Sequence, residues 1–287
     1  MRRRYMSSAA GSSGSLVNMT FGEYYYSDGT ISADILSGKT ILGVCVVPAS
    51  HMMDGYPRVM ALWDIYSNGR KVTSQNGSAP LVSWDDWDNG TPHANLRLTN
   101  YTTVPKTSSG NYTYGSTQNY GGLGSETSIN SMTTKSGDYY YHSNYTSKII
   151  PSPYLANGNA NPAYRTSGTA TSDFDGWGNT DVIVAANGIA AKACRSYAPT
   201  TATSGKWYLP ACGELGYVVP KLGDINTMLT NAGGVALSTS NYKWYWSSSE
   251  SSIDYAWIVN FNTGLVNDIG KGSEDYVRPF LATWQLG

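Results

Sequence analysis

The stretch that decides the fold lies in the last third of the chain and opens with Lys206-Trp207-Tyr208-Leu209-Pro210. It continues as Trp244-Tyr245-Trp246-Ser247-Ser248-Ser249-Glu250 and Ala256-Trp257-Ile258-Val259-Asn260-Phe261, and it closes with Tyr276-Val277-Arg278-Pro279-Phe280. Apolar anchors recur along it at regular intervals, whereas Ser, Asn, Asp, Tyr and Gly fill the positions between them. Short aromatic and β-branched runs bounded by turn-forming residues are typical of strands. The pattern therefore predicts several short strands with polar side chains between the core positions.

Two helical patterns lie beside these strands. The first is Ala-rich and runs from Asp181 to Ala193, with Thr180 as its expected cap. The second runs from Leu215 to Leu229 and ends near residues 231–234, where two glycines follow. Pro220 lies inside it and should kink or split the helix. Helices followed by a group of short strands predict an α+β domain.

The first half of the chain predicts a β-rich opening and then loses its periodicity. We expect strands at Phe21–Tyr26, Thr40–Val47 and Val59–Ile65. Residues 83–172 are rich in Gly, Ser, Thr, Asn and Tyr, and we expect a loop-rich insertion packed by its own aromatic residues, such as Trp84. Residues 1–18 read as a flexible leader. The predicted organisation is one domain over 19–287, with the insertion at 83–172 and a ligand-display region at 206–283.

Composition restricts the class of partner. Charged residues make up 14% of the 287, the formal net charge is -1, and there are 23 Tyr and 9 Trp. A nucleic-acid partner would need a clustered basic face, so we expect none. The run Arg2-Arg3-Arg4 is followed by Ser, Gly and Ala rather than by the apolar core of a secretion signal. No stretch is long and apolar enough to predict membrane insertion.

Motifs for metal or catalytic chemistry are incomplete. The three His are far apart, and the acidic run from Asp85 to Gly90 lacks the Glu that would complete a calcium loop, because the twelfth position counted from Asp86 is Arg97. Cys45 lies in an apolar run and reads as a small buried residue. Cys194 and Cys212 could form a bridge, which the sequence leaves open. Without a nucleophile elbow or paired carboxylates, we expect no metal, no cofactor and no enzymatic activity.

An ordered set of short motifs resembles the C-type-lectin-fold proteins of gut bacteria and their phages. The set comprises Trp207-Tyr208-Leu209-Pro210, Glu214-Leu215, Tyr245–Glu250, Ala256-Trp257-x-Val259-x-Phe261, Gly264 and Tyr276–Phe280. That group includes fibrillar-paralogue domains and variable proteins diversified by retroelements, and a Bordetella phage tail-fibre adhesin is similar in function. The ordered combination covers about the last 80 residues and is more specific than any of its parts.

The resemblance implies a C-type lectin fold with two helices, short antiparallel sheets, and first and last strands brought together. It also implies a fixed framework that displays variable side chains on one face. The framework residues would be Trp207, Leu209, Trp246, Ala256, Trp257, Val259, Phe261 and Val277, with Arg278-Pro279 locking the last strand. The display positions, and hence the predicted ligand-binding residues, would be Tyr242, Tyr245, Ser248, Ser251, Ser252, Ile253, Asp254, Tyr255, Asn260, Asn262, Thr263, Asn267, Asp268, Ile269, Ser273, Glu274 and Asp275.

The function that follows from the resemblance is receptor binding. We expect an adhesive protein of a phage or prophage that binds a protein or glycan on a bacterial surface, located in the virion or at a cell surface, with trimers as the expected homo-oligomer. Two alternatives stay open. One is an enzyme similar to the formylglycine-generating group, which requires Cys194 and Cys212 to meet in a pocket. The other is a purely structural subunit of a virion or fimbria.

Overall fold

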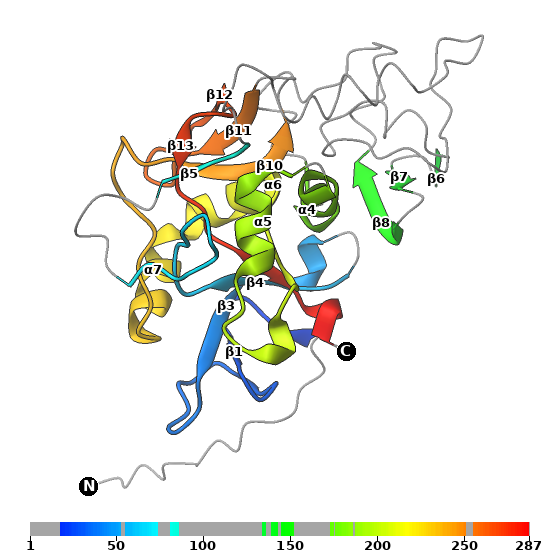
Figure 1. The fold of residues 1–287 in the computed structure, drawn as a ribbon. Helices are drawn as coiled ribbons and strands as arrows, with labels where there is room; N and C mark the ends of the chain where they lie inside the picture. The colour runs from blue at the N-terminus through cyan, green and yellow to red at the C-terminus, as the bar shows by residue number, and fades with distance from the viewer. Residues whose placement is uncertain are drawn as a thin grey trace, which may run out of the picture.

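The computed structural model describes residues 18–52, 55–73, 81–85, 134–135, 139–142, 145–151, 173–174, 176–185, 187–250 and 255–286. At its centre is a six-stranded antiparallel sheet in the order β2-β1-β3-β4-β14-β9 (Figure 1). The first and last strands join one sheet, as expected, although β3 and β4 lie between them. The strands of this sheet are β1 (Tyr24–Tyr26), β2 (Ile31–Ser32), β3 (Ile41–Val47), β4 (Arg58–Ala61), β9 (Trp207–Tyr208) and β14 (Phe280–Ala282).

Both faces of the central sheet are buried, because apolar residues occupy successive positions of its strands. In β4, Val59 and Ala61 belong to one core cluster, whereas Met60 belongs to a second one on the opposite face. Side chains of a strand point alternately to its two faces. The predicted apolar strand at Thr40–Val47 is confirmed as β3, with all seven of its residues buried.

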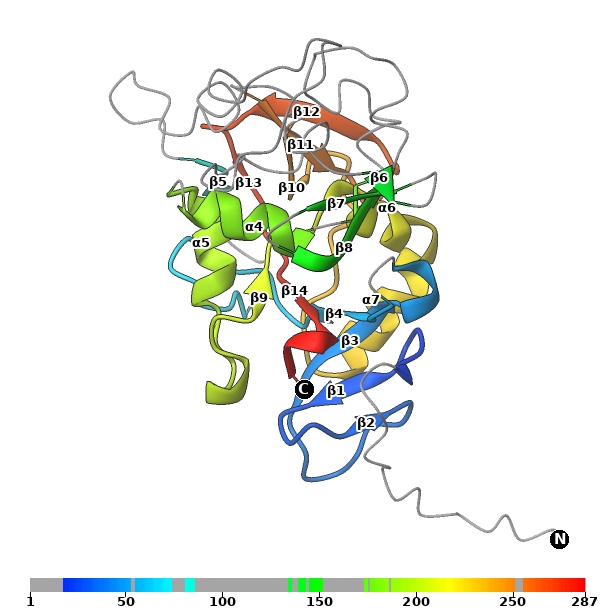
Figure 2. The same cartoon turned by 90° about the vertical axis from the view of Figure 1, so that its right-hand side faces the viewer.

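Helices cover both faces of this sheet. Helix α5 (Ile189–Ser196) packs Ala190, Ala193 and Cys194 into the first cluster. Helices α6 (Cys212–Val218) and α7 (Leu222–Asn231) pack their apolar residues into the second cluster. Figure 2 shows the sheet strands running between α5 on one side and α7 on the other. The split at Pro220 is confirmed: a short 3-10 turn, η5 (Val219–Lys221), separates α6 from α7.

The Ala-rich helix is two helices and not one. Helix α4 (Gly176–Ala185) begins before Thr180, so Thr180 is inside the helix and the prediction that it caps the N-terminus is wrong. Its hydroxyl instead donates to the carbonyl of Leu209 at 3.1 Å. The chain breaks at Asn187, whose φ is 72°, and at Gly188, where a Cβ would lie 2.2 Å from Ile183 Cγ2. The left-handed backbone at Asn187 interrupts the helix, so α5 begins as a separate helix at Ile189.

A second antiparallel sheet adds to both core clusters. It has the order β10-β11-β12, with β10 at Tyr245–Glu250, β11 at Tyr255–Val259 and β12 at Val266–Gly270. Trp246 and Ile258 belong to the first cluster, and Trp257 and Val259 to the second. All eight predicted framework residues are buried.

The start of the predicted insertion belongs to the core. Strand β5 (Val82–Ser83) pairs with β13 (Glu274–Asp275), and Trp84 is fully buried. The indole of Trp84 donates to the carbonyl of Ser247 at 2.8 Å, and the indole of Trp246 donates to the carbonyl of Val82 at 2.7 Å. The prediction that Trp84 packs a separate loop is therefore wrong, since this residue joins residues 82–85 to β10.

Within the predicted insertion, a three-stranded antiparallel sheet comprises β6 (Thr134–Lys135), β7 (Tyr139–His142) and β8 (Tyr145–Pro151). The remainder of 86–172 and the predicted leader up to residue 17 lie outside the described residues. The fold is thus α+β with antiparallel sheets, as predicted, and the C-type lectin assignment stays a prediction.

Candidate functional site

The hairpin of β11 and β12 positions the predicted display surface. The two strands pair without a break from Tyr255 with Gly270 to Val259 with Val266. The turn between them, residues 260–265, is held by Asn260. Its amide nitrogen lies 3.2, 3.1 and 3.1 Å from the carbonyls of Ser240, Asn241 and Lys243, and its Oδ1 accepts from the backbone N and the hydroxyl of Thr263, both at 3.0 Å. One buried amide thus ties the turn to the neighbouring loop.

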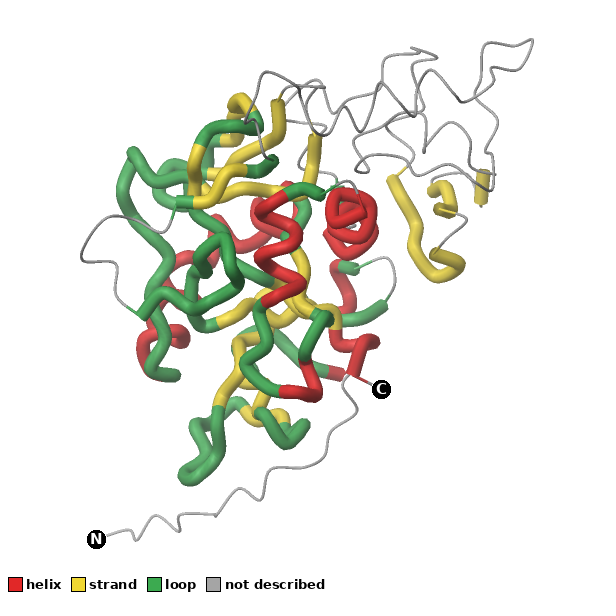
Figure 3. Tube along the Cα trace, in the orientation of Figure 1, coloured by secondary structure: helices red, strands yellow, loops and turns green. Residues whose placement is uncertain are grey.

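The loop 232–244, which joins α7 to β10 and is drawn among the green loop segments in Figure 3, is tied to this turn by Asn260 on either side of Tyr242. Tyr242 is 92% exposed and Leu265 is 58% exposed. Asn262 is exposed and donates to Asn241 Oδ1 at 2.5 Å, which joins the loop and the turn a second time. We name Tyr242, Asn262, Thr263 and Leu265 the turn group. It presents one aromatic ring, one aliphatic side chain and two polar side chains to solvent.

The remaining described display positions lie along β12 and at the other end of the hairpin. Tyr255 is 46% exposed at the start of β11, opposite Gly270, and Glu274 is exposed just beyond the tight turn in which Ser273 N donates to Gly270 O at 2.8 Å. Since a strand rises by about 3.3 Å per residue, the five residues of β12 separate this end from the turn group by about 15 Å. On β12 itself, Asn267 is exposed, and Asp268 and Ile269 are half-buried.

Four predicted display residues are buried, so the prediction that they lie on the surface is wrong. The Tyr245 ring packs 4.7 Å from the Phe261 ring, between centroids, and its hydroxyl accepts from Ser238 N at 3.1 Å. Asn260 is buried and ties the hairpin turn to the loop 232–244. The backbone N–H of Ser248 donates a hydrogen bond to Pro210 O at 2.8 Å, and the Ser248 hydroxyl accepts one from Asn179 at 3.1 Å. Asp275 lies in β13, where it pairs with β5.

The buried Ser248 belongs to a polar network that connects three elements. Asp173 Oδ2 accepts from Asn179 at 2.8 Å and from the Ser249 hydroxyl at 2.6 Å. The Ser249 hydroxyl in turn accepts from the backbone N of Cys212, at the start of α6. Because buried polar groups need hydrogen-bond partners, the serines between the aromatic anchors serve the interior. The other predicted positions, Ser251, Ser252, Ile253 and Asp254, lie outside the described residues.

Asp275 makes stability depend on pH. Burial raises the pKa of its carboxyl to about 7, from an ordinary value near 4. The folded state therefore keeps this proton to higher pH than the unfolded state, and the stability present below pH 4 is lost as pH rises through 7. We expect Asp275→Asn to raise the free energy of unfolding by at least about 2 kcal/mol at pH 8 and to change it little at pH 4. Urea unfolding at both pH values would test this, and an equal effect at both would contradict it.

The cysteines do not form the arrangement that the enzyme alternative requires. Cys45, Cys194 and Cys212 are free and buried, and Cys194 and Cys212 belong to different core clusters. Burial raises the pKa of both thiols, which keeps them protonated. The predicted option of a bridge between them is not realised.

The described residues also contain no group of three or more His, Cys, Asp or Glu placed to hold a metal ion. Among the same residues, none of the helices has the length and apolar character needed to cross a bilayer.

Sequence reasoning missed Leu265, which is exposed on the turn, and Asn241, which accepts a hydrogen bond from Asn262. A signal for Leu265 was available in the glycine at position 264, because glycine favours tight turns, and its φ in the structure is 71°. Asn241 gave no such signal, because its position beside Asn262 depends on a contact between residues 21 apart in sequence.

Comparisons with known proteins place few constraints on this chain. No protein-family model matches it, and no curated protein matches it. Among solved structures, a fimbrial protein from Bacteroides ovatus ATCC 8483 aligns with a TM-score of 0.49 and 17% sequence identity. The alignment covers 92% of this chain and 49% of the other, so this chain spans about half the length of that protein.

Proposed function

We propose that this chain is a non-catalytic binding protein of the outer surface of a bacterial cell or virion, and that the turn group contacts its receptor. The observation that carries the proposal is the exposure of Tyr242 on the loop 232–244 and of Leu265 on the turn, two segments that the buried Asn260 holds together. Solvent-exposed aromatic and aliphatic side chains on a fixed turn suit recognition more than they suit folding.

Rigidity of this turn favours binding for a physical reason. A contact surface that is ordered before association loses less conformational entropy on binding. Tyr offers a large contact area with few rotatable bonds, and Asn and Thr offer adaptable hydrogen bonds. The turn group combines these side chains, and the core behind it is closed by Tyr245, Phe261 and Val259.

The receptor that we propose is a protein or glycan on a bacterial surface, and diversification by a retroelement remains part of the proposal. Support for it comes from β11, where the display position Tyr255 is exposed and the framework positions Ala256, Trp257 and Val259 are buried. A near-identical template repeat beside a reverse-transcriptase gene, found by sequencing the gene's neighbourhood, would be the expected result. A neighbourhood with neither would contradict diversification but leave receptor binding intact.

Binding of the isolated protein to intact bacterial cells tests the proposed function. We expect the fluorescently labelled protein to bind a subset of strains saturably, with periodate treatment of the cells abolishing binding if the receptor is a glycan and protease treatment abolishing it if the receptor is a protein. Absence of saturable binding to every strain of a broad gut-bacterial panel would contradict the proposal and favour a purely structural subunit.

A matched pair of surface variants identifies the contact site. The turn variant combines Tyr242→Ala, Asn262→Ala and Leu265→Ser. The control is Ile35→Ser, which alters an exposed side chain in the loop between β2 and β3. Both should keep the wild-type melting temperature within about 2 °C, because exposed substitutions change stability little. Only the turn variant should lose cell binding.

A further inference from the structure

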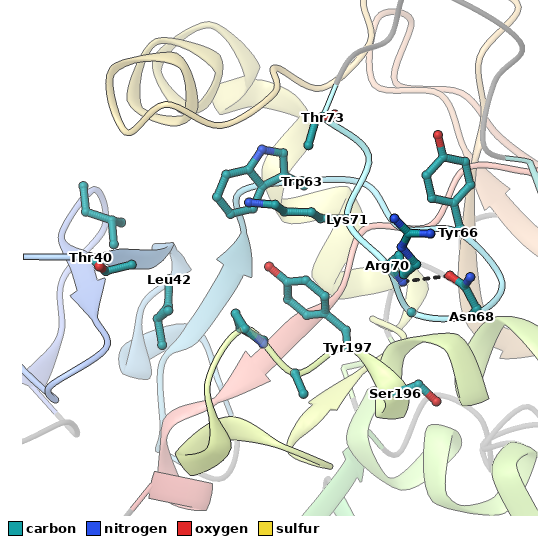
Figure 4. Close-up of a pocket in the computed structure, with 14 residues that line it drawn as sticks. Thr40, Leu42, Trp63, Tyr66, Asn68, Arg70, Lys71, Thr73, Ser196 and Tyr197 are labelled. Atoms are coloured by element: carbon teal, nitrogen blue, oxygen red, sulfur yellow. Dashed lines mark hydrogen bonds between the residues drawn. The ribbon is translucent and has the colours of Figure 1, made fainter.

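A pocket of about 700 Å³ lies away from the hairpin, between the start of β3, the segment 63–73 and the segment after α5 (Figure 4). We propose that it binds a carboxylate-bearing sugar, such as a uronic or sialic acid residue of a glycan. Ligand pockets commonly have volumes of about 300–1,000 Å³, so this one can hold an acidic sugar with a neighbouring residue. The pocket shares no residue with the turn group, so an acidic sugar could bind there whether or not the turn group contacts a receptor.

The walls of the pocket are fixed by backbone contacts. Segment 64–72 folds into a ribbon in which Tyr66 N donates to Arg70 O at 2.9 Å and Val72 N donates to Asp64 O at 2.8 Å. Gly69 at its tip has a φ of 77°, and a Cβ there would lie 2.7 Å from the backbone carbon of Ser196. The ribbon therefore packs closely against the end of α5. A pocket built this way is present before a ligand binds.

Aromatic and cationic side chains face each other in the pocket. Lys71 Nζ lies 4.3 Å from the Trp63 ring centroid, and Trp63 is half-buried. Tyr66 is exposed, and Arg70 follows it on the same ribbon. Aromatic faces suit the apolar faces of sugar rings, and a guanidinium suits a carboxylate through paired hydrogen bonds.

Charge selects the ligand class. No acidic side chain is among the residues that line the pocket, and within the described chain neither Arg70 nor Lys71 forms an ion pair. Two cations without an acidic partner attract an anion. A neutral sugar would use the aromatic rings and leave this attraction unused, so the acidic sugar is favoured.

A buried hydroxyl supplies a further polar contact. Tyr197 is almost fully buried, and its hydroxyl has no hydrogen-bond partner in the described chain. Burial raises the pKa of this phenol, so it stays protonated and can donate a hydrogen bond. Figure 4 shows the hydroxyl pointing toward Trp63 and Lys71. Because a buried polar group without a partner is unfavourable, an acceptor oxygen of a ligand would complete this site.

Calorimetric titration with matched acidic and neutral sugars tests the proposal. The probes are digalacturonic acid against galactobiose, and sialyllactose against lactose, which distinguish a uronic from a sialic ligand. We expect one acidic probe to bind at least about 10-fold more tightly than its neutral counterpart. Its binding should weaken as salt is raised, because salt screens exposed charges. Equal binding within both pairs, or no binding of any probe, would overturn the proposal.

Variants of the pocket add a second readout. Arg70→Gln and Tyr197→Phe should each weaken binding of the acidic probe by at least about 5-fold, and Trp63→Ala should abolish the change in tryptophan fluorescence on binding. Arg70 is exposed, so its variant tests the site without risk to folding. The control is Lys221→Met, which removes a lysine stacked 3.5 Å from the Tyr217 ring centroid outside the pocket. Unchanged binding by Arg70→Gln, or an equal loss with Lys221→Met, would contradict the site.

Discussion

Replacing Arg278 with methionine is expected to lower the free energy of unfolding by about 3–5 kcal/mol, because it leaves the Asp64 carboxylate buried without the Arg278 cation. Arg278 Nε lies 2.6 Å from Asp64 Oδ1, and both side chains are fully buried. Its Nη1 and Nη2 also donate to the carbonyls of Ala61 and Val235, at 3.1 and 3.0 Å. The loss is a large fraction of the roughly 5–15 kcal/mol by which folded domains are stable.

A double-mutant cycle separates the ion pair from loss of packing. We expect the double variant Asp64→Leu, Arg278→Met to be less destabilising than the sum of the two single variants. The reason is that the double variant leaves no buried charge without a partner. Urea denaturation of the four proteins measures this. A single-variant loss below about 1 kcal/mol, or strict additivity, would show that the pair does not lock the last strand to β4.

Two tyrosines that lie three residues apart should differ widely in their effect on stability. Tyr245→Ala removes a ring packed 4.7 Å from Phe261 and 5.4 Å from Tyr276, between centroids, and should cost about 3–5 kcal/mol. Tyr242→Ala removes a side chain that is almost fully exposed and should change stability by less than about 0.5 kcal/mol. The difference follows from burial alone.

Tyr245→Phe is the matched control for this comparison. It keeps the ring and loses the hydrogen bond from Ser238 N, so a loss of about 1 kcal/mol is expected. Thermal and urea unfolding of all three variants would check the order. Similar losses for Tyr242→Ala and Tyr245→Ala would mean that the loop before β10 contributes to the core.

The elements that could be predicted from sequence are those with strong local signals. The run Ile41–Val47 has apolar side chains for both faces of a sheet, and Pro220 lacks the N–H that a continuous helix needs. The break between α4 and α5 could not be predicted in this way. It depends on the close packing of Gly188 against Ile183 and on the left-handed backbone at Asn187, neither of which alters the apolar periodicity.

The candidate site could be predicted only in part, because local sequence patterns do not reveal contacts between distant segments. The framework positions were correct because large apolar residues at strand spacing are buried wherever the sheet lies. The polar positions between them were ambiguous, since Ser248 and Asn260 serve buried hydrogen bonds whereas Asn262 and Tyr242 face solvent. Only contacts between distant segments distinguish these roles.

Cell binding by the turn variant, compared with Ile35→Ser, shows whether the turn group contacts the receptor. The measured quantity is the apparent Kd from a binding titration on a strain that the wild type recognises. We expect Tyr242→Ala, Asn262→Ala and Leu265→Ser combined to raise this Kd at least about 10-fold, on the order of 1.4 kcal/mol in binding free energy. We also expect wild-type binding for Ile35→Ser and unchanged melting temperatures for both. Wild-type binding by a folded turn variant would contradict the claim that the β11–β12 turn is the receptor-contacting surface.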